Sequence, residues 1–263
     1  MAGALHAETE RLPIMNAVGA AGVRVAMSAT VTLPTAAQGP LRFEGVLGGP
    51  VDVIDNLNAN AHAFLPYNPT IVEIGAHEGA GTMVLAQTYP YGSIYAFEPN
   101  PRAFAMLERR AADHPHVVAV NLALGTTTNE VALYLGAEAG RNASLLSPRR
   151  VPGGGEAPAV RVACTTVDEW CLRSGVVGID FLRVDAGGYE LQILASARRM
   201  LERALVVVTR THRHRPRAGI VTFPVMRLFL EMSGFELLSH SYEEGREGEA
   251  VFVRQALYDS VFR

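Results

Sequence analysis

The sequence of 263 residues has little cysteine, few aromatic residues and no long apolar run. Its two cysteines, Cys164 and Cys171, form no CxxC pair and lie at no metal-ligand spacing, so they predict buried thiols in a reducing compartment and no metal site. The longest apolar runs stay below 18 residues, which is too short for a membrane span. Arg24 interrupts the early apolar stretch, where a signal peptide needs continuity. We therefore expect a cytoplasmic protein without a membrane partner.

A strong charge of one sign is also missing. The formal net charge is −3, so no basic field favours nucleic acid as a partner. The length fits one α/β domain, which we expect over residues 51–263. Residues 1–50 are rich in alanine, glycine and small polar residues, and we interpret them as an N-terminal extension with one strand at Val23–Leu33.

From Thr70 onward, short apolar runs alternate with amphipathic segments. Continuous apolar runs are typical of strands buried on both faces, and alternation with helices predicts a parallel sheet with crossover connections. The expected strands are Thr70–Ile74, Ser93–Phe97, Val117–Leu122, Val131–Leu135, Val160–Cys164, Phe181–Val184 and Leu205–Val208, followed by an antiparallel pair at Phe235–Ser239 and Ala250–Arg254. The expected helices are Val53–Leu65, Thr82–Thr88, Pro101–Ala112, Val167–Arg173, Tyr189–Leu201 and Phe223–Met232.

A long segment without periodicity covers Gly136–Pro158 and contains three consecutive glycines. Segments of this length within a compact domain are usually functional or disordered. Two interpretations stay open, a lid over the substrate and a plain mobile insertion.

A glycine-rich turn follows the first of the regular strands, in the run VEIGAHEGAGT at residues 72–82. Glycines there let the backbone approach a ligand, while free N–H groups at the helix start face it. Glu73 stands where a dinucleotide-binding turn normally has an apolar residue. A carboxylate there can face a cationic amino group, such as that of the methionine part of S-adenosylmethionine.

The next strand ends in YAFEPNP at residues 95–101, so that Glu98 follows Glu73 by 25 positions. A carboxylate at this spacing accepts hydrogen bonds from a ribose diol. The pair of motifs therefore predicts a nucleoside-containing cofactor.

With NLALG at 121–125, TTVDEW at 165–170, IDFLRVDAGGYE at 179–190 and GF at 234–235, the sequence resembles the FkbM family of S-adenosylmethionine-dependent methyltransferases. The resemblance implies the Rossmann-like class I methyltransferase fold. Its seven-stranded, mostly parallel sheet has the order 3-2-1-4-5-7-6, with strand 7 antiparallel and helices on both faces. It also implies the cofactor S-adenosyl-L-methionine. The implied binding residues are Glu73, Gly75, His77, Gly79 and Thr82 at the methionine end, Glu98 with Pro99 at the ribose, and Asn121 and Ala123 beside the adenine.

The reacting centre is expected at the end of Phe181–Val184. Arg183 and Asp185 point to the same side of the strand because side chains alternate. Asp185 is the candidate base or substrate anchor, and Arg183 either pairs with it or binds an anionic substrate.

The sequence departs from the family pattern at two places. The resemblance implies a glutamate at Gly187 and another at Arg210, so the site should be more positive than usual. Three explanations stay open: an anionic acceptor, His212 acting as the base, and a degenerate relative that binds the cofactor without catalysis. We expect an O-methyltransferase acting on a hydroxylated small metabolite, a sugar or a polyketide-like acceptor, either as a monomer or as a homo-oligomer. A nicotinamide-dependent oxidoreductase is the weaker alternative, because Glu73 and the spacing of the turn disfavour it.

Overall fold

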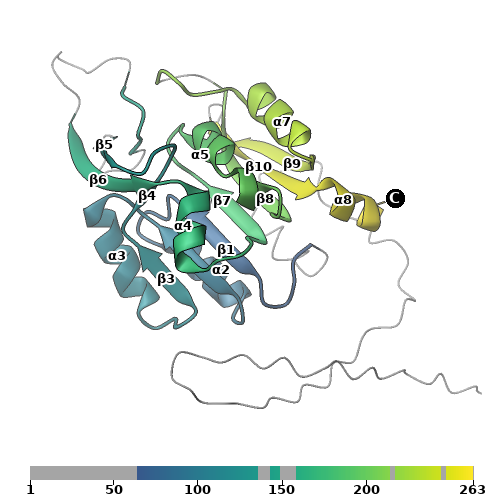
Figure 1. Cartoon of the computed structure of the whole chain (residues 1–263), viewed down its shortest axis with the longest axis horizontal. Helices are drawn as coiled ribbons and strands as arrows, with labels where there is room; N and C mark the ends of the chain where they lie inside the picture. Colours follow the sequence, from purple (N-terminus) through teal and green to yellow (C-terminus); the bar gives the residue numbers. More distant parts are fainter. Residues whose placement is uncertain (1–63, 136–142, 149–157, 214–216, 244–246, 263) are drawn as a thin grey trace, which may run out of the picture. The chain divides into compact units, whose positions relative to one another are not determined.

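Figure 1 shows the computed structural model of the chain, which describes residues 64–135, 143–148, 158–213, 217–243 and 247–262. The expected strand at Val23–Leu33 and the N-terminal extension lie outside these residues. The expected helix at Val53–Leu65 also lies outside them, except for Phe64 and Leu65, which form a turn and a bend.

The main sheet has seven strands in the order β3-β2-β1-β7-β8-β10-β9. All pairs are parallel except those of β10, which runs antiparallel to both β8 and β9. This is the order 3-2-1-4-5-7-6 with an antiparallel seventh strand, so the predicted topology is confirmed. The strands are β1 (Thr70–Ile74), β2 (Ser93–Phe97), β3 (Val117–Val120), β7 (Phe181–Val184), β8 (Val206–His212), β9 (Phe235–Glu243) and β10 (Glu247–Arg254).

Two of the expected strands do not join this sheet. β5 (Glu130–Tyr134) and β6 (Ala159–Thr165) pair antiparallel and form a second, three-stranded sheet with β4 (Ala123–Leu124). Their apolar residues alternate, and Leu133 and Val162 face a small cluster of their own. This one-sided burial is the reason that the runs at 131–135 and 160–164 belong to a small antiparallel sheet.

Helices cover both faces of the main sheet, as expected (Figure 1). α2 and α3 pack on the face that carries Ala96. α4 to α7 pack on the opposite face, which carries Val72 and Ile74. The helix expected over Tyr189–Leu201 is divided at Ala197, whose ψ of 38° departs from helical backbone. The helices are α2 (Ala80–Thr88), α3 (Pro101–Ala111), α4 (Val167–Ser174), α5 (Glu190–Ser196), α6 (Arg198–Leu201), α7 (Phe223–Met232) and α8 (Gln255–Phe262).

Local capping fixes where two of these helices begin. The Asn100 side chain accepts a hydrogen bond from the backbone N–H of Arg102, and Pro101 fills the first position of α3. Thr166 accepts one from the N–H of Glu169 at the start of α4. Asn100 directly follows the loop after β2, so this cap also fixes the end of the strand that carries Glu98.

The core lies between the sheet and α4 to α7. Strand residues such as Leu182, Val184 and Val207 pack there against Ile193 and Leu230 from the helices. Within the described residues, no helix is long and apolar enough to cross a membrane.

Candidate active site

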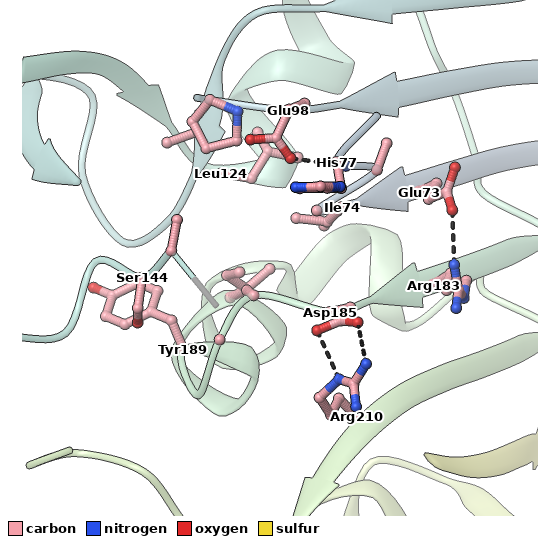
Figure 2. Close-up of a pocket in the computed structure, with 18 of the residues that line it drawn as sticks. Glu73, Ile74, His77, Glu98, Leu124, Ser144, Arg183, Asp185, Tyr189 and Arg210 are labelled. Carbon is pink, nitrogen blue, oxygen red and sulfur yellow. Dashed lines mark hydrogen bonds and ion pairs between the residues drawn. The ribbon is translucent and has the colours of Figure 1, made fainter. Parts of the chain in front are cut away.

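A cavity of about 510 Å³ opens at the carboxyl ends of β1, β2 and β7 (Figure 2). It lies where the strand order reverses between β1 and β7, the position at which open α/β sheets bind ligands. Eight of the predicted site residues line it: Glu73, Gly75, His77, Glu98, Pro99, Ala123, Arg183 and Asp185. Four others are not among its lining residues, namely Gly79, Thr82, Asn121 and His212.

The glycine-rich turn brings backbone to the cavity floor. Gly75 has a φ of 84°, and a Cβ at this position would lie 1.8 Å from the carbonyl oxygen of Asp185. No other residue type fits between the ends of β1 and β7. His77 has a φ of 51°, the one positive value among the described non-glycine residues, and its N–H donates to Glu98 Oε2 at 2.8 Å. Strained backbone of this kind is typical of functional sites.

The start of α2 faces the same cavity through Ala80 and Gly81. No side chain caps this helix, so its first N–H groups form a ready anion site. Gly79 serves packing, because a Cβ there would lie 2.8 Å from Leu107 Cδ1 of α3. Gly79 thus contributes to the cavity indirectly, because it lets α2 pack closely against α3.

The carboxylate of Glu73 is already engaged by other side chains. It is 1% exposed, its Oε2 accepts a hydrogen bond from Thr82 Oγ1 at 2.5 Å, and its Oε1 lies 2.8 Å from Arg183 Nη1. Thr82 therefore contributes by orienting Glu73. An ammonium group of a ligand would share Glu73 with Arg183, and the role of Glu73 toward methionine stays a prediction.

Glu98 is buried at the end of β2 and is held by backbone. Its two oxygens accept from the N–H groups of His77 and Asn100, each at 2.8 Å. Burial raises the pKa of Glu98, and these two hydrogen bonds offset part of that rise. Each oxygen retains a lone pair for a ribose hydroxyl. Asn121 donates to the carbonyl oxygens of Glu98 and Pro99 at 2.8 and 3.2 Å, so it fixes the backbone that follows β2.

Asp185 faces the cavity from the residue after β7 and forms a two-point ion pair with Arg210 of β8 (Figure 2). Arg210 Nε donates to Oδ1 at 2.9 Å, and Nη2 lies 2.8 Å from Oδ2. The ion pair considered from the sequence, between Arg183 and Asp185, is therefore not formed. Arg183 instead pairs with Glu73 and, at 3.4 Å, with Glu249.

Sequence reasoning missed the acidic residues of β10. Glu247 and Glu249 stand opposite His212 and Arg210 in the antiparallel register. The expected strand began only at Ala250, so neither carboxylate was assigned to the sheet. Together with Glu73, Asp185 and Glu190, they give five carboxylates against Arg183, Arg210 and His212. Basic residues therefore do not dominate this network of ion pairs, and an anionic acceptor stays a prediction.

His212 is buried at the end of β8 and is not among the residues that line the cavity. Its Nε2 lies 3.3 Å from Glu190 Oε2, and its Nδ1 lies 3.7 Å from Glu247 Oε1. Burial opposes protonation, but the hydrogen bond with Glu190 and the negative charges of Glu190 and Glu247 outweigh it and raise the pKa of His212 to about 9. This shift favours the protonated ring at neutral pH and therefore disfavours His212 as the base.

Glu190 also connects His212 to the backbone that lines the cavity. Its other oxygen accepts from the N–H groups of Ala186 at 3.0 Å and Gly188 at 2.9 Å, in the turn that follows Asp185. His212 and Glu190 thus hold the shape of the turn that carries the expected reacting centre. Among the described residues, no group of three or more histidine, cysteine or acidic side chains has the arrangement of a metal site.

The doubly wound sheet with an antiparallel seventh strand, and a cavity at its switch point, define a class I methyltransferase fold. The model of the methyltransferase FkbM domain matches residues 73–237. The chain belongs to this family, and its cofactor is S-adenosyl-L-methionine. The residues present fit that cofactor, because the cavity offers helix N–H groups, a buried carboxylate and an apolar end within a volume typical of ligand sites.

The chain is also similar to a curated methyltransferase and to solved structures. The 2-O-methyltransferase NoeI of Sinorhizobium fredii is 22% identical over 199 residues, which cover 70% of this chain and 79% of NoeI. The solved methyltransferase FkbM of Methylobacillus flagellatus is 14% identical with a TM-score of 0.48, and the match covers 71% of this chain but only 44% of that one. The N-terminal domain of EvdMO1, solved with SAH and D-fucose, is 15% identical with a TM-score of 0.46, over 82% of this chain and 90% of that one.

Proposed function

We propose that the protein transfers a methyl group to a hydroxyl of a small acceptor, a sugar or a polyketide-like metabolite. The observation that carries the proposal is the carboxylate of Asp185, fixed by Arg210 at the carboxyl end of β7 and facing the cavity. The activity in the name of NoeI, 2-O-methylation, supports oxygen as the accepting atom. When bound, the cofactor supplies a methyl group on a sulfonium, and an acceptor oxygen takes this group and loses its proton.

Different residues of the site bind the cofactor, accept the proton and hold the site in shape. The start of α2 binds the carboxylate of the methionine part, and Glu98 accepts from the ribose hydroxyls. Asp185 accepts a hydrogen bond from the acceptor hydroxyl and receives its proton, since two further lone pairs of its oxygens point away from Arg210. Arg210 fixes the carboxylate in one orientation, which favours reaction by alignment. His212 acts only through Glu190 and the turn at 186–188.

The second candidate is a protein that binds the cofactor without catalysis. The engagement of Asp185 by Arg210 favours it, because the guanidinium already contacts both oxygens of the carboxylate. The sequence departures at Gly187 and Arg210 do not add to this case. Arg210 holds Asp185 in the cavity, and β10 supplies carboxylates of its own.

The deciding experiment measures formation of S-adenosylhomocysteine with a panel of monosaccharides and hydroxylated polyketide fragments. We expect turnover with at least one acceptor. Asp185→Asn should lower the rate by about 100-fold or more, which is typical of a lost general base, and should leave the affinity for S-adenosylhomocysteine within a factor of about two. Turnover by Asp185→Asn at the wild-type rate would refute the role of Asp185. Tight cofactor binding without turnover on any acceptor would favour the non-catalytic candidate.

The same proposal places the catalytic domain at residues 51–263 and treats residues 1–50 as an extension to it. The protein containing only residues 51–263 should retain its affinity for S-adenosylhomocysteine. A cytoplasmic location and either a monomeric or a homo-oligomeric state belong to the proposal as well. Fractionation of cells and light scattering of the purified chain test these two points.

A further inference from the structure

Residues 143–148, called the strap below, run from the small sheet to residue 217, and residues 143–145 line the cavity. At one end, Ser144 exchanges two backbone hydrogen bonds with Tyr134 of β5, at 2.9 and 3.0 Å. At the other end, Pro148 forms a β-bridge with Arg217, and Arg217 Nη1 donates to the carbonyl oxygen of Leu146 at 2.8 Å. Ser144 Oγ also accepts from the N–H of Leu146 at 3.0 Å. The strap is therefore fixed at both ends and internally.

Glycines form the surface on which the strap lies. Gly187 has a φ of 59°, and a Cβ there would lie 2.4 Å from the carbonyl oxygen of Ala143 and 3.2 Å from Ser144 Cβ. Gly219 has a φ of 95°, and its Cβ would lie 2.9 Å from Leu146 Cδ2. Both the space and the backbone conformation thus require glycine. Backbone of the strap, which cannot move aside like a flexible side chain, fills the space beside Gly187.

The strap supplies one wall of the apolar end of the cavity. Ala143, Ser144 and Leu145 all line it, together with Leu124 and Leu133. Leu145 also packs against the cluster formed by the small sheet. The cavity is also lined by the polar groups described above, at Glu98, His77 and the start of α2. A planar aromatic base with apolar faces fits the apolar end, because burial there removes its faces from water.

We infer that Gly187 is a positioning residue, which seats the strap so that Leu145 forms a wall of the adenine subsite. The inference rests on cofactor binding, which the family establishes, and on no particular acceptor. Gly187, interpreted from the sequence as the loss of an acidic group, thereby gains a role of its own. The strap also gives the long segment at Gly136–Pro158 a structural role in its described part.

The test compares two ligands by calorimetry, S-adenosylhomocysteine and 5′-methylthioadenosine, which lacks the amino-acid part. Leu145→Ala removes three carbons from the apolar wall, so we expect both ligands to bind about tenfold more weakly, and by the same factor. Leu172→Ala, on a side chain that is 63% exposed on α4, is the matched control and should bind both as the wild type does. Unchanged affinity in Leu145→Ala, or a loss confined to S-adenosylhomocysteine, would overturn the inference.

The substitution Gly187→Ala tests, in the absence of cofactor, whether Gly187 positions the strap. Hydrogen exchange should become faster by on the order of tenfold at the amides of Ser144 and Tyr134, while β1 and β7 keep their protection. Unchanged exchange at these two amides would overturn the proposed role of Gly187 in positioning the strap. If Gly187→Ala does not fold, Leu145→Ala still tests whether Leu145 forms a wall of the adenine subsite. Failure of the wild type to bind S-adenosylhomocysteine would overturn this inference together with the cofactor site. Normal cofactor binding without turnover would overturn methyl transfer alone.

Discussion

The buried pair of His212 and Glu190 predicts that the free energy of unfolding falls as the pH rises above neutrality. His212 has a pKa of 6.5 in an unfolded chain and of about 9 in the structure, since the contacts with Glu190 and Glu247 outweigh the cost of burial. Folding therefore favours the protonated ring. Its stabilising contribution is complete below pH 6.5, decreases between the two pKa values and disappears above about 9.

The size of the effect follows from the same two values. One pKa unit corresponds to about 1.4 kcal/mol. The raised pKa of His212 therefore amounts to about 3 kcal/mol of stability at low pH, with a slope of about 1.4 kcal/mol per pH unit between the two pKa values. A typical domain has an unfolding free energy of roughly 5–15 kcal/mol, so this contribution is a large part of the total.

The assay is urea unfolding of the wild type and of His212→Gln, from about pH 6 to about pH 9. Titrating groups that do not interact with His212 are common to both proteins and cancel in the difference between their unfolding free energies. We expect this difference to be largest at the acidic end and to shrink by roughly 3 kcal/mol across the range. A difference that stays constant with pH would refute the reasoning, because His212 would then stabilise the fold without its charge.

Three further predictions concern the core and the cofactor site. Phe252 of β10 is fully buried, so Phe252→Ala should lower the unfolding free energy by about 3–5 kcal/mol in urea titrations. A loss below about 1 kcal/mol would contradict its packing. Gly75→Ala would place a Cβ 1.8 Å from the carbonyl oxygen of Asp185, so it should fail to fold or should lose S-adenosylhomocysteine binding in calorimetry; wild-type affinity would contradict the close approach. Glu98→Gln should weaken that binding by about 1–3 kcal/mol. Because burial raises the pKa of Glu98, acidification should weaken wild-type binding at a higher pH than an ordinary carboxyl would allow, and Glu98→Gln should lack this pH dependence.

The main sheet and most of the cavity wall could be predicted from the sequence, because both depend on short, local patterns. Continuous apolar runs mark strands buried on both faces, and the glycine-rich turn can only lie at the end of β1. The residues expected there, such as Gly75 and Glu98, do line the cavity. Their position depends on local backbone, which a short stretch of sequence determines.

Contacts between strands far apart in the chain could not be predicted in this way. Arg183 and Asp185 share a face by alternation, but their partners come from β1, β8 and β10, whose register the sequence does not state. Glu247 and Glu249 meet basic residues only because β10 runs antiparallel beside β8. The protonated state of His212 likewise depends on carboxylates that lie 22 and 35 positions away from it in the chain.

Gly187 and the strap have a consequence for how sequences of this kind can change. A side chain at residue 187 and the observed course of Ala143 and Ser144 are mutually exclusive, because they claim the same space. Installing a glutamate here would therefore displace the strap and would not simply restore a missing charge. Glycine at this position and a strap-forming segment after β5 should be inherited together. Among relatives of this chain, the two should covary, and a hybrid with only one of them should be the rare case.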